Sequence, residues 1–246
     1  MPFRLSRSKG RTSGRPTSGN GASSFHLWWR LPSLPSPLVS VSVDCEVVVE
    51  PKADALYFWA LQVGFAGGGA GHTGLQWLPS SARVRRAVNW GGYGPDGREL
   101  SGTQSPMADI DGNPNTRGYE WSTGAPHRLT VERGEQGWRA SVDGKTIREL
   151  FGGGSALVDP VVWSEVFARC DDPSVVVRWS QFTGVTAAGE TVVPTGLAVN
   201  YQSYADGGCD NTTMVPDDGG GVSQVTNETR SVPQGSVIDL RPSASG

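Results

Sequence analysis

Glycine and proline interrupt this chain too often for long helices. Its 246 residues include 34 glycines and 17 prolines, about one residue in five, and both types destabilise helix interiors. A coiled coil or helical bundle is therefore excluded. Hydrophobic residues still make up 37% of the chain and include nine tryptophans, which is enough for a core. No apolar run is long enough to cross a membrane as a helix. We expect one β-rich domain.

Short apolar segments separated by turn sequences run from residue 38 onward. In residues 128–150, three stretches alternate between apolar and polar residues, and Asp143-Gly144 between the last two is a typical hairpin turn. We predict a three-stranded meander in which Trp138 points inward. Further strands are expected at 174–180, 192–201, 222–229 and 236–240. The pattern predicts an all-β fold, a two-layer antiparallel β-sandwich with little helix.

Residues 159–170 allow two interpretations. Asp159 followed by a proline could begin a helix, on one face of which Trp163 and Phe167 would lie. In a strand, Trp163, Glu165 and Phe167 would share one face instead. The valine-rich sequence that follows favours the strand, paired as a hairpin with residues 174–180.

Basic residues dominate the first 24 positions, which contain no acid and are otherwise rich in serine, glycine and threonine. We expect residues 1–24 to be a disordered tail and residues 25–246 to be a single folded domain. At the start of that domain, the adjacent Trp28 and Trp29 should point to opposite faces of a strand. All 24 acidic residues follow the tail, so the domain is not predicted to bind nucleic acid.

The cysteines are few and odd in number: Cys45, Cys170 and Cys209. Three thiols do not make a disulfide framework, so one bridge plus a free thiol or three reduced thiols remain open, and we expect reduced thiols. The three histidines are far apart in sequence, which does not indicate a zinc site. No apolar leader segment is visible at the N-terminus, which favours a cytoplasmic location.

Two resemblances support the sandwich. The sequences EWSTGAPHRLTV and WRASVDG resemble the central meander of concanavalin-like jelly rolls, a fold that laminin-G-like domains and family-sixteen glucanases share. The sequences LYFWALQVGF, GLQW, AVNWGGYG, NPNTRGYEW, VWSEVFARCDDPSVVVRWS and GGVSQVTN resemble a family of bacterial β-sandwich proteins, over about residues 25–235. That family has no established activity, so the resemblance implies a fold and no functional site.

Glycosidase chemistry has weak support. Glucanases of this fold carry acidic residues at short spacing along one strand, where two carboxylates act as nucleophile and general acid. The corresponding segment WSEVFARCDD supplies Glu165 alone, because Asp171 and Asp172 are expected in a turn. A polysaccharide hydrolase or lyase is therefore the weakest of our three hypotheses.

Five residues are candidates for ligand binding. Trp163 beside Glu165 could stack on a sugar ring while the carboxylate orients a hydroxyl. Alternatively, Glu165 forms an ion pair with Arg178 across the predicted hairpin. Trp90 and Tyr93 flank two glycines that would let a ligand approach closely. The alternative for that pair is a structural role, in which both side chains cap the edge of the core.

A polar loop offers a candidate for calcium. Asp109, Asp111 and Asn113 place oxygen-bearing side chains at alternate positions, as a calcium loop requires. The EF-hand pattern is broken, however, because Pro114 stands where that loop needs glycine. Such Asp, Asn, Gly and Pro mixtures are also typical of ordinary turns. No other cofactor is expected.

Three functional hypotheses follow. The first is a non-catalytic, lectin-like binding module with a carbohydrate ligand, and the second is an interaction or structural protein without a small ligand. The third is the polysaccharide hydrolase or lyase. An exposed tryptophan beside polar groups would favour the first, and burial of all nine tryptophans the second. Two carboxylates in one cleft would favour the third. The expected partner is a carbohydrate or another protein.

Overall fold

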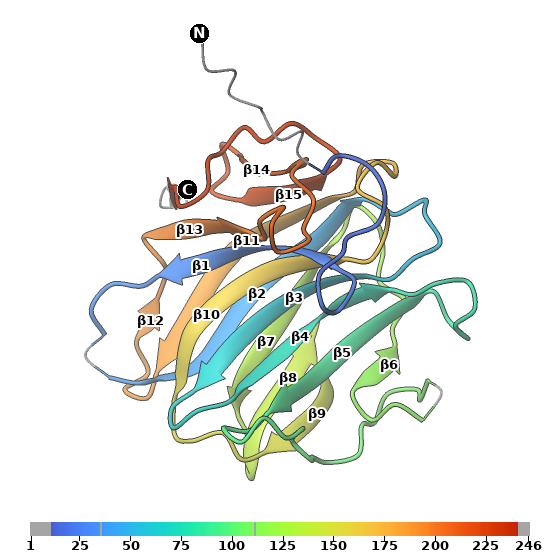
Figure 1. The fold of residues 1–246 in the computed structure, drawn as a ribbon. Helices are drawn as coiled ribbons and strands as arrows, with labels where there is room; N and C mark the ends of the chain where they lie inside the picture. Colours follow the sequence, from blue (N-terminus) through green and yellow to red (C-terminus); the bar gives the residue numbers. More distant parts are fainter. Residues whose placement is uncertain (1–10, 35, 111, 241–246) are drawn as a thin grey trace, which may run out of the picture.

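The computed structural model describes residues 11–240 except residues 35 and 111. Within these residues the regular structure consists of sixteen β-strands and no helix. All strand pairs are antiparallel, and the strands lie in two layers (Figure 1). The predicted all-β sandwich is confirmed. No helix in the described residues is long and apolar enough to cross a membrane.

The first layer, sheet A, has eight strands. In spatial order they are β16 (Val237–Asp239), β13 (Gly196–Tyr201), β1 (Ser23–Arg30), β10 (Leu157–Val166), β3 (Tyr57–Phe65), β4 (Ala70–Trp77), β5 (Arg86–Tyr93) and β6 (Thr116–Gly118).

The second layer, sheet B, has seven strands in series, and one short strand, β12 (Thr191–Val192), pairs with β11 at its side. In spatial order the seven are β14 (Thr212–Pro216), β15 (Val222–Thr226), β11 (Val176–Thr186), β2 (Leu38–Val49), β7 (Pro126–Arg133), β8 (Gly137–Val142) and β9 (Lys145–Phe151). Among the described residues, the single pair Leu157–Leu38 links the two sheets.

The core lies between the sheets. Alternate residues of each strand point into it, so that the apolar side of both sheets is removed from water. The side chains that are completely enclosed include five tryptophans, Trp59, Trp90, Trp121, Trp138 and Trp179. The predicted meander is present as β7, β8 and β9, and Trp138 points inward as predicted.

The ambiguous segment forms strand β10, but the predicted hairpin is wrong. Strand β10 lies between β1 and β3 in sheet A, whereas β11 lies between β2 and β15 in sheet B. Residues 167–175 therefore cross from one layer to the other instead of forming a tight turn. A crossing brings the valine-rich β11 against the core from the opposite side, which buries both strands.

Part of the predicted tail is ordered by backbone hydrogen bonds. The Cys170 N–H donates to the Gly14 carbonyl, and the Thr17 N–H donates to the Gly207 carbonyl, each at 2.9 Å. Ala22 is buried, and strand β1 begins at Ser23. Residues 11–24 thus contradict the expected disorder, because loops from elsewhere in the chain satisfy their polar groups. The remaining ten residues of the expected tail lie outside the described residues.

The expectation of three reduced thiols is also wrong. Cys170 and Cys209 form a disulfide, and Cys45 is a buried free thiol in the core. The two bonded cysteines are 39 positions apart in sequence, so only the tertiary structure brings them together. A structural disulfide is typical of proteins in oxidising compartments. It weakens the sequence argument for a cytoplasmic location.

Candidate functional site: the outer face of sheet A

Sheet A has a second apolar cluster on the side that faces away from the core. Because side chains alternate along each strand, every residue between two core residues points to this outer face. Phe58, Ala60, Val161 and Trp163 form the cluster. Around it, in neighbouring register positions, lie His26, Trp28, Gln62, His72, Gln76, Asn89, Tyr93 and Glu165. We call these twelve residues the outer face.

Three rings pack together at its centre. The Phe58 ring meets the Trp163 ring edge-on at a centroid distance of 4.9 Å, and the His72 ring lies 5.6 Å from Phe58 and 5.8 Å from Trp163. Beneath them Ala60 is fully buried. The Trp163 indole N–H donates to the Gln62 side-chain oxygen at 3.2 Å. Burial lowers the pKa of His72 to about 4, so this ring is neutral at pH 7.

A more exposed aromatic pair lies beside this cluster on strand β1. The rings of His26 and Trp28 are stacked, with centroids 6.4 Å apart and planes 21° apart. Trp28 is 36% exposed, whereas each of the other eight tryptophans is at most 9% exposed or is fully enclosed. Trp28 is therefore the most exposed of the nine indoles. Burial lowers the pKa of His26 to about 4, which keeps this ring neutral as well.

Several buried polar atoms of the outer face have no hydrogen-bond partner in the described part of the chain. They are Nδ1 of His26, the side-chain oxygen of Gln76 and the side-chain oxygen of Asn89. Gln76 and Asn89 are each only 7% exposed, although the Asn89 amide N–H₂ does donate to the Thr116 hydroxyl. A buried polar group without a partner is costly, and such groups concentrate where a ligand or water completes the bonding.

Glu165 provides the carboxylate of this face. It sits on β10 between Ser24 of β1 and Phe58 of β3. Its Oε1 accepts a hydrogen bond from the Asn20 side-chain amide at 2.6 Å. Burial raises the pKa of Glu165, and the bond from Asn20 offsets part of that rise. The N-terminal segment, once expected to be disordered, therefore holds this carboxylate in place.

Three of the five predicted binding residues lie on the outer face. Trp163 and Glu165 are two positions apart on β10. Tyr93 is at the end of β5, three strands away from β10, and is 52% exposed. Trp90 points the other way, into the core, and its indole N–H donates to the Trp138 carbonyl at 3.1 Å. The predicted Trp90–Tyr93 stacking platform is therefore absent.

Arg178 lies on the other sheet, so the predicted Glu165–Arg178 ion pair is wrong. Arg178 belongs to β11 and pairs with Asp217 at 2.5 Å and with Glu46 at 3.7 Å. These carboxylates raise the pKa of Arg178, with the Asp217 hydrogen bond as the largest cause. The pairing failed because it depended on the hairpin, and β10 and β11 are not neighbours.

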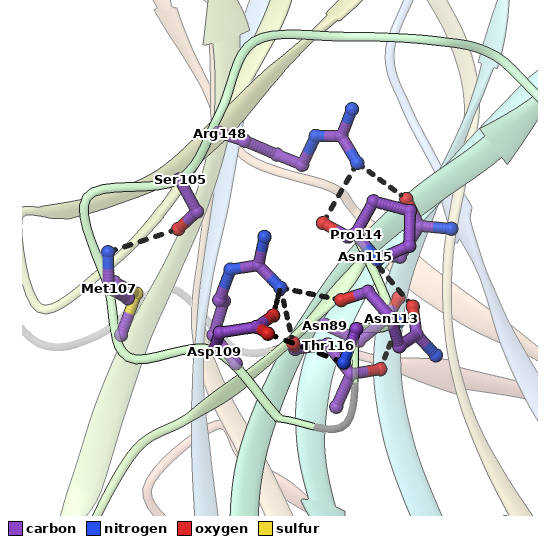
Figure 2. Close-up of polar contacts among 11 residues, drawn as sticks. Asn89, Ser105, Met107, Asp109, Asn113, Pro114, Asn115, Thr116 and Arg148 are labelled. Atoms are coloured by element: carbon purple, nitrogen blue, oxygen red, sulfur yellow. Dashed lines mark hydrogen bonds and ion pairs between the residues drawn. The ribbon is translucent and has the colours of Figure 1, made fainter.

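The candidate calcium residues are engaged in protein contacts (Figure 2). The Asp109 carboxylate accepts from the Arg117 guanidinium at 3.1 Å, and Asn113 Oδ1 accepts from the Asn115 backbone N–H at 2.9 Å. Asp111 lies outside the described residues. Within residues 11–240, apart from positions 35 and 111, no group of three His, Cys, Asp or Glu residues is placed to hold a metal ion. Calcium binding at this loop stays a sequence-based prediction.

Most residues of the outer face were not predicted from the sequence to bind a ligand. Gln62, Gln76 and Asn89 were not predicted to lie there, although each stands between two strongly apolar residues of its strand. That alternation is the signal that could have found them. His72 lacks such neighbours, since it stands between Gly71 and Thr73. Trp28 was expected opposite Trp29, and this expectation is confirmed, since Trp29 is buried in the core.

Comparisons with known proteins find similarity only among solved structures, since no protein-family model and no curated protein matches the chain. The chain is similar to scytalido-glutamic peptidase, with 13% identity, a TM-score of 0.44, and coverage of 82% of this chain and 97% of the peptidase. It is similar to SCP-B, a member of the eqolisin family of peptidases, with 13% identity, a TM-score of 0.40 and the same coverage.

A third similar structure is the catalytic domain of an endo-1,3-β-glucanase (laminarinase) from Thermotoga petrophila. It is 11% identical, with a TM-score of 0.29, and the match covers 85% of this chain and 75% of the glucanase domain.

Proposed function

We propose that this protein is a non-catalytic binding module whose outer face of sheet A holds a neutral carbohydrate chain. The observation that carries the proposal is the exposed Trp28, stacked on the partly buried His26 and lying beside buried polar atoms that have no partner among the described residues. Ligand sites combine apolar and aromatic surface with a few convergent polar groups. A sugar ring has that same combination, since it presents apolar C–H faces and a rim of hydroxyls.

The unpartnered atoms favour a ligand that donates hydrogen bonds. The free oxygens of Gln76 and Asn89 accept only, and the neutral His26 ring can donate or accept. Sugar hydroxyls can satisfy both kinds of partner.

Charge favours a neutral ligand. Glu165 is the one charged group among the twelve outer-face residues, and Arg30, the end residue of β1, lies beyond them. A face of this composition lacks the cluster of basic side chains that binds phosphates.

The number of carboxylates favours binding over hydrolysis. Glycosidases of most families need two carboxyl groups roughly 5–10 Å apart, one on each side of the scissile bond. Among the described outer-face residues, Glu165 is the only carboxylate. We therefore assign Glu165 the role of orienting a ligand hydroxyl. The second candidate function is hydrolysis of the sugar chain with Glu165 as general acid. Burial raises the pKa of Glu165, and a carboxyl with a raised pKa can act in that role.

The test is a titration of the whole protein with neutral hexasaccharides of β-1,3-linked glucose, β-1,4-linked glucose, xylose and N-acetylglucosamine, followed by calorimetry. At least one should bind, and Trp28→Ala should weaken it roughly tenfold or more, as expected for the loss of an anchoring aromatic. Tyr204→Ala is the matched control, since Tyr204 is an exposed aromatic in the loop after β13. Equal weakening by both variants, or no binding to any of the four sugars, would reject the proposal.

Glu165→Gln separates the two candidates. In the binding proposal this variant weakens affinity, and neither it nor the wild type releases reducing ends from the bound sugar. In the hydrolytic alternative the wild type releases reducing ends, and the variant binds but does not. Release by the wild type would replace the first candidate with the second.

A further inference from the structure

The open end of sheet A borders a groove that the carbohydrate proposal does not use. The edge strand is β16, whose one partner within the described residues is β13. Beside it lies a cavity of about 380 Å³, formed between two segments. One segment is the turn between β14 and β15, Pro216 to Gly221, and the other runs from Val232 to Leu240. The groove thus separates the edge of sheet A from the edge hairpin of sheet B.

Strand β16 presents unpaired backbone groups along this edge. Its register aligns Ile238 with Leu197 of β13, and the flanking bonds run from Val199 N–H to the Ser236 carbonyl and from Leu240 N–H to the Thr195 carbonyl. In an antiparallel ladder, alternate residues direct their N–H and C=O groups to opposite sides. Val237 and Asp239 therefore direct theirs away from β13. No backbone bond to either residue is found among the described residues outside the β13 ladder.

The groove is acidic. Asp217, Asp218 and Asp239 line it, and among the residues that the structure describes no Lys, Arg or His does. Asp217 is neutralised by Arg178 and accepts the backbone N–H groups of Gly219 and Gly221. Asp218 and Asp239 are exposed and make no ion pair with any described residue. Two free carboxylates thus stand on the two opposite walls of the groove.

We propose that this groove binds an extended, basic peptide segment of a partner protein, which adds to sheet A as a strand beside β16. Edge strands with free backbone groups are templates for such pairing. The backbone of the guest would bond to Val237 and Asp239, and its Lys or Arg side chains would meet Asp218 and Asp239. The exposed Val237 side chain supplies an apolar contact for an alternate guest residue.

The test uses a fluorescein-labelled octapeptide of alternating lysine and valine and measures fluorescence anisotropy with the full chain. Two matched peptides serve as controls, one with glutamate in place of lysine and one with methylated backbone nitrogens on alternate residues. The lysine–valine peptide should bind saturably, and the affinity of each control should be lower by roughly fivefold or more. The glutamate peptide lacks the charge pairing, and the methylated peptide lacks the backbone hydrogen bonds. Equal binding of the three peptides, or no saturable binding, would overturn the proposal.

Protein variants locate the site. Val237→Pro removes the outward N–H, and proline is tolerated where an edge-strand N–H faces solvent. This variant and the double variant Asp218→Asn, Asp239→Asn should each lower the affinity for the lysine–valine peptide roughly fivefold or more. Asp96→Asn, a change in the loop after β5, is the control. It should leave the peptide affinity within about twofold of the wild type, as expected for a surface substitution. Unchanged affinity in both Val237→Pro and the double variant would refute the site.

Two other occupants are separable outcomes. If the protein is a dimer in size-exclusion chromatography and Val237→Pro makes it a monomer, a second copy of this chain occupies the edge. If the peptide binds only after deletion of residues 1–10, which carry Arg4, Arg7 and Lys9, the chain's own basic segment is the occupant. Either result overturns the assignment to a partner protein. Neither bears on sugar binding, which depends on the face of the sheet and not on its edge.

Discussion

The two faces of sheet A are built from the same strands and differ in the burial and the contacts of their aromatic side chains. On the inner face, Trp59 and Trp90 are enclosed, and the Trp90 N–H donates to the Trp138 carbonyl of sheet B. On the outer face, Trp28 is exposed and Trp163 is packed between Phe58 and His72. On β1 and β3 an inner aromatic is the next residue to an outer one, Trp29 beside Trp28 and Trp59 beside Phe58.

The polar neighbours explain the difference. Core tryptophans such as Trp121 and Trp138 donate to backbone carbonyls of this chain, at 3.2 and 2.7 Å, and contribute to stability by burial. Nε1 of two further core tryptophans, Trp29 and Trp77, has no partner among the described residues, so the two faces differ in how many polar side chains they carry and not in whether every polar atom is paired. Outer aromatics alternate across the strands with histidine and amide side chains, some of whose buried atoms lack partners. Such an arrangement gains little stability and suits recognition. The inner face thus holds the fold together, and the outer face is left for a ligand.

The largest predicted effect is in the core, which the inner face of sheet A forms together with sheet B. Trp138→Ala should lower the free energy of unfolding by roughly 3–5 kcal/mol, because it removes a buried ring that contacts both Phe65 and Arg133. Denaturant unfolding followed by circular dichroism measures it. A loss below about 1 kcal/mol would mean that the inner face is not the stabilising one.

The disulfide should have the next largest effect. The double variant Cys170→Ala, Cys209→Ala should lose roughly 2–4 kcal/mol, since the bridge closes a loop of 39 positions. Hydrogen exchange should also rise in residues 11–22, whose contacts at Gly14 and Thr17 depend on the two bridged loops. Cys45→Ala, a change of the free buried thiol, is the control for cavity formation. A double variant as stable as the wild type would contradict this role.

The outer face should make stability depend on pH. His26 and His72 have a pKa of about 4 in the folded protein, below the ordinary 6.5, so the unfolded chain binds protons first. The free energy of unfolding should therefore be highest above pH 6.5 and fall as the pH drops from 6.5 to about 4, by up to about 1.4 kcal/mol per pH unit for each histidine. The raised pKa of Glu165 works in the opposite direction, since its contribution is lost as the pH rises through that pKa.

His72→Gln should flatten this pH profile, measured by urea unfolding at a series of pH values. Phe58→Leu changes the same ring cluster without a titratable group, so it should keep the wild-type slope. An identical slope in wild type and His72→Gln would show that His72 is not buried in its neutral form.

The smallest predicted effect on stability is at Trp28. Trp28→Ala should change the free energy of unfolding by about 1 kcal/mol or less, because the side chain is already partly in water. Thermal unfolding measures it against Trp138→Ala. A loss comparable to that of Trp138→Ala would erase the difference between the two faces.

Local patterns predicted much of the fold. The meander of β7 to β9 was predictable because its alternation and the Asp143-Gly144 turn act between sequence neighbours. The placement of β10 and β11 in different sheets was not predictable, because the choice of sheet for each strand depends on how the whole sandwich closes. For the same reason, the disulfide between Cys170 and Cys209 left no sequence signal beyond the two residues themselves.

The candidate site was predictable only in part. Trp163, Glu165 and Tyr93 were predicted to bind a ligand and do lie on the outer face. Trp90 was predicted to bind as well, because its neighbouring glycines suggested an open surface, but it lies in the core. The alternation of Val88 with Trp90 would have placed it in the core. The contact between Asn20 and Glu165 joins residues far apart in sequence. No local pattern could reveal it.

The most direct test of the account compares tryptophans of the two faces in one spectrum. The indole N–H signals of protein labelled with ¹⁵N are recorded while the tightest of the four hexasaccharides is added. The signals of Trp28 and Trp163 should shift, and those of the inner-face Trp59 and Trp90 and of Trp138 in sheet B should not. Shifts confined to the inner tryptophans, or an unshifted Trp28 at saturating sugar, would contradict the assignment of ligand binding to the outer face of sheet A.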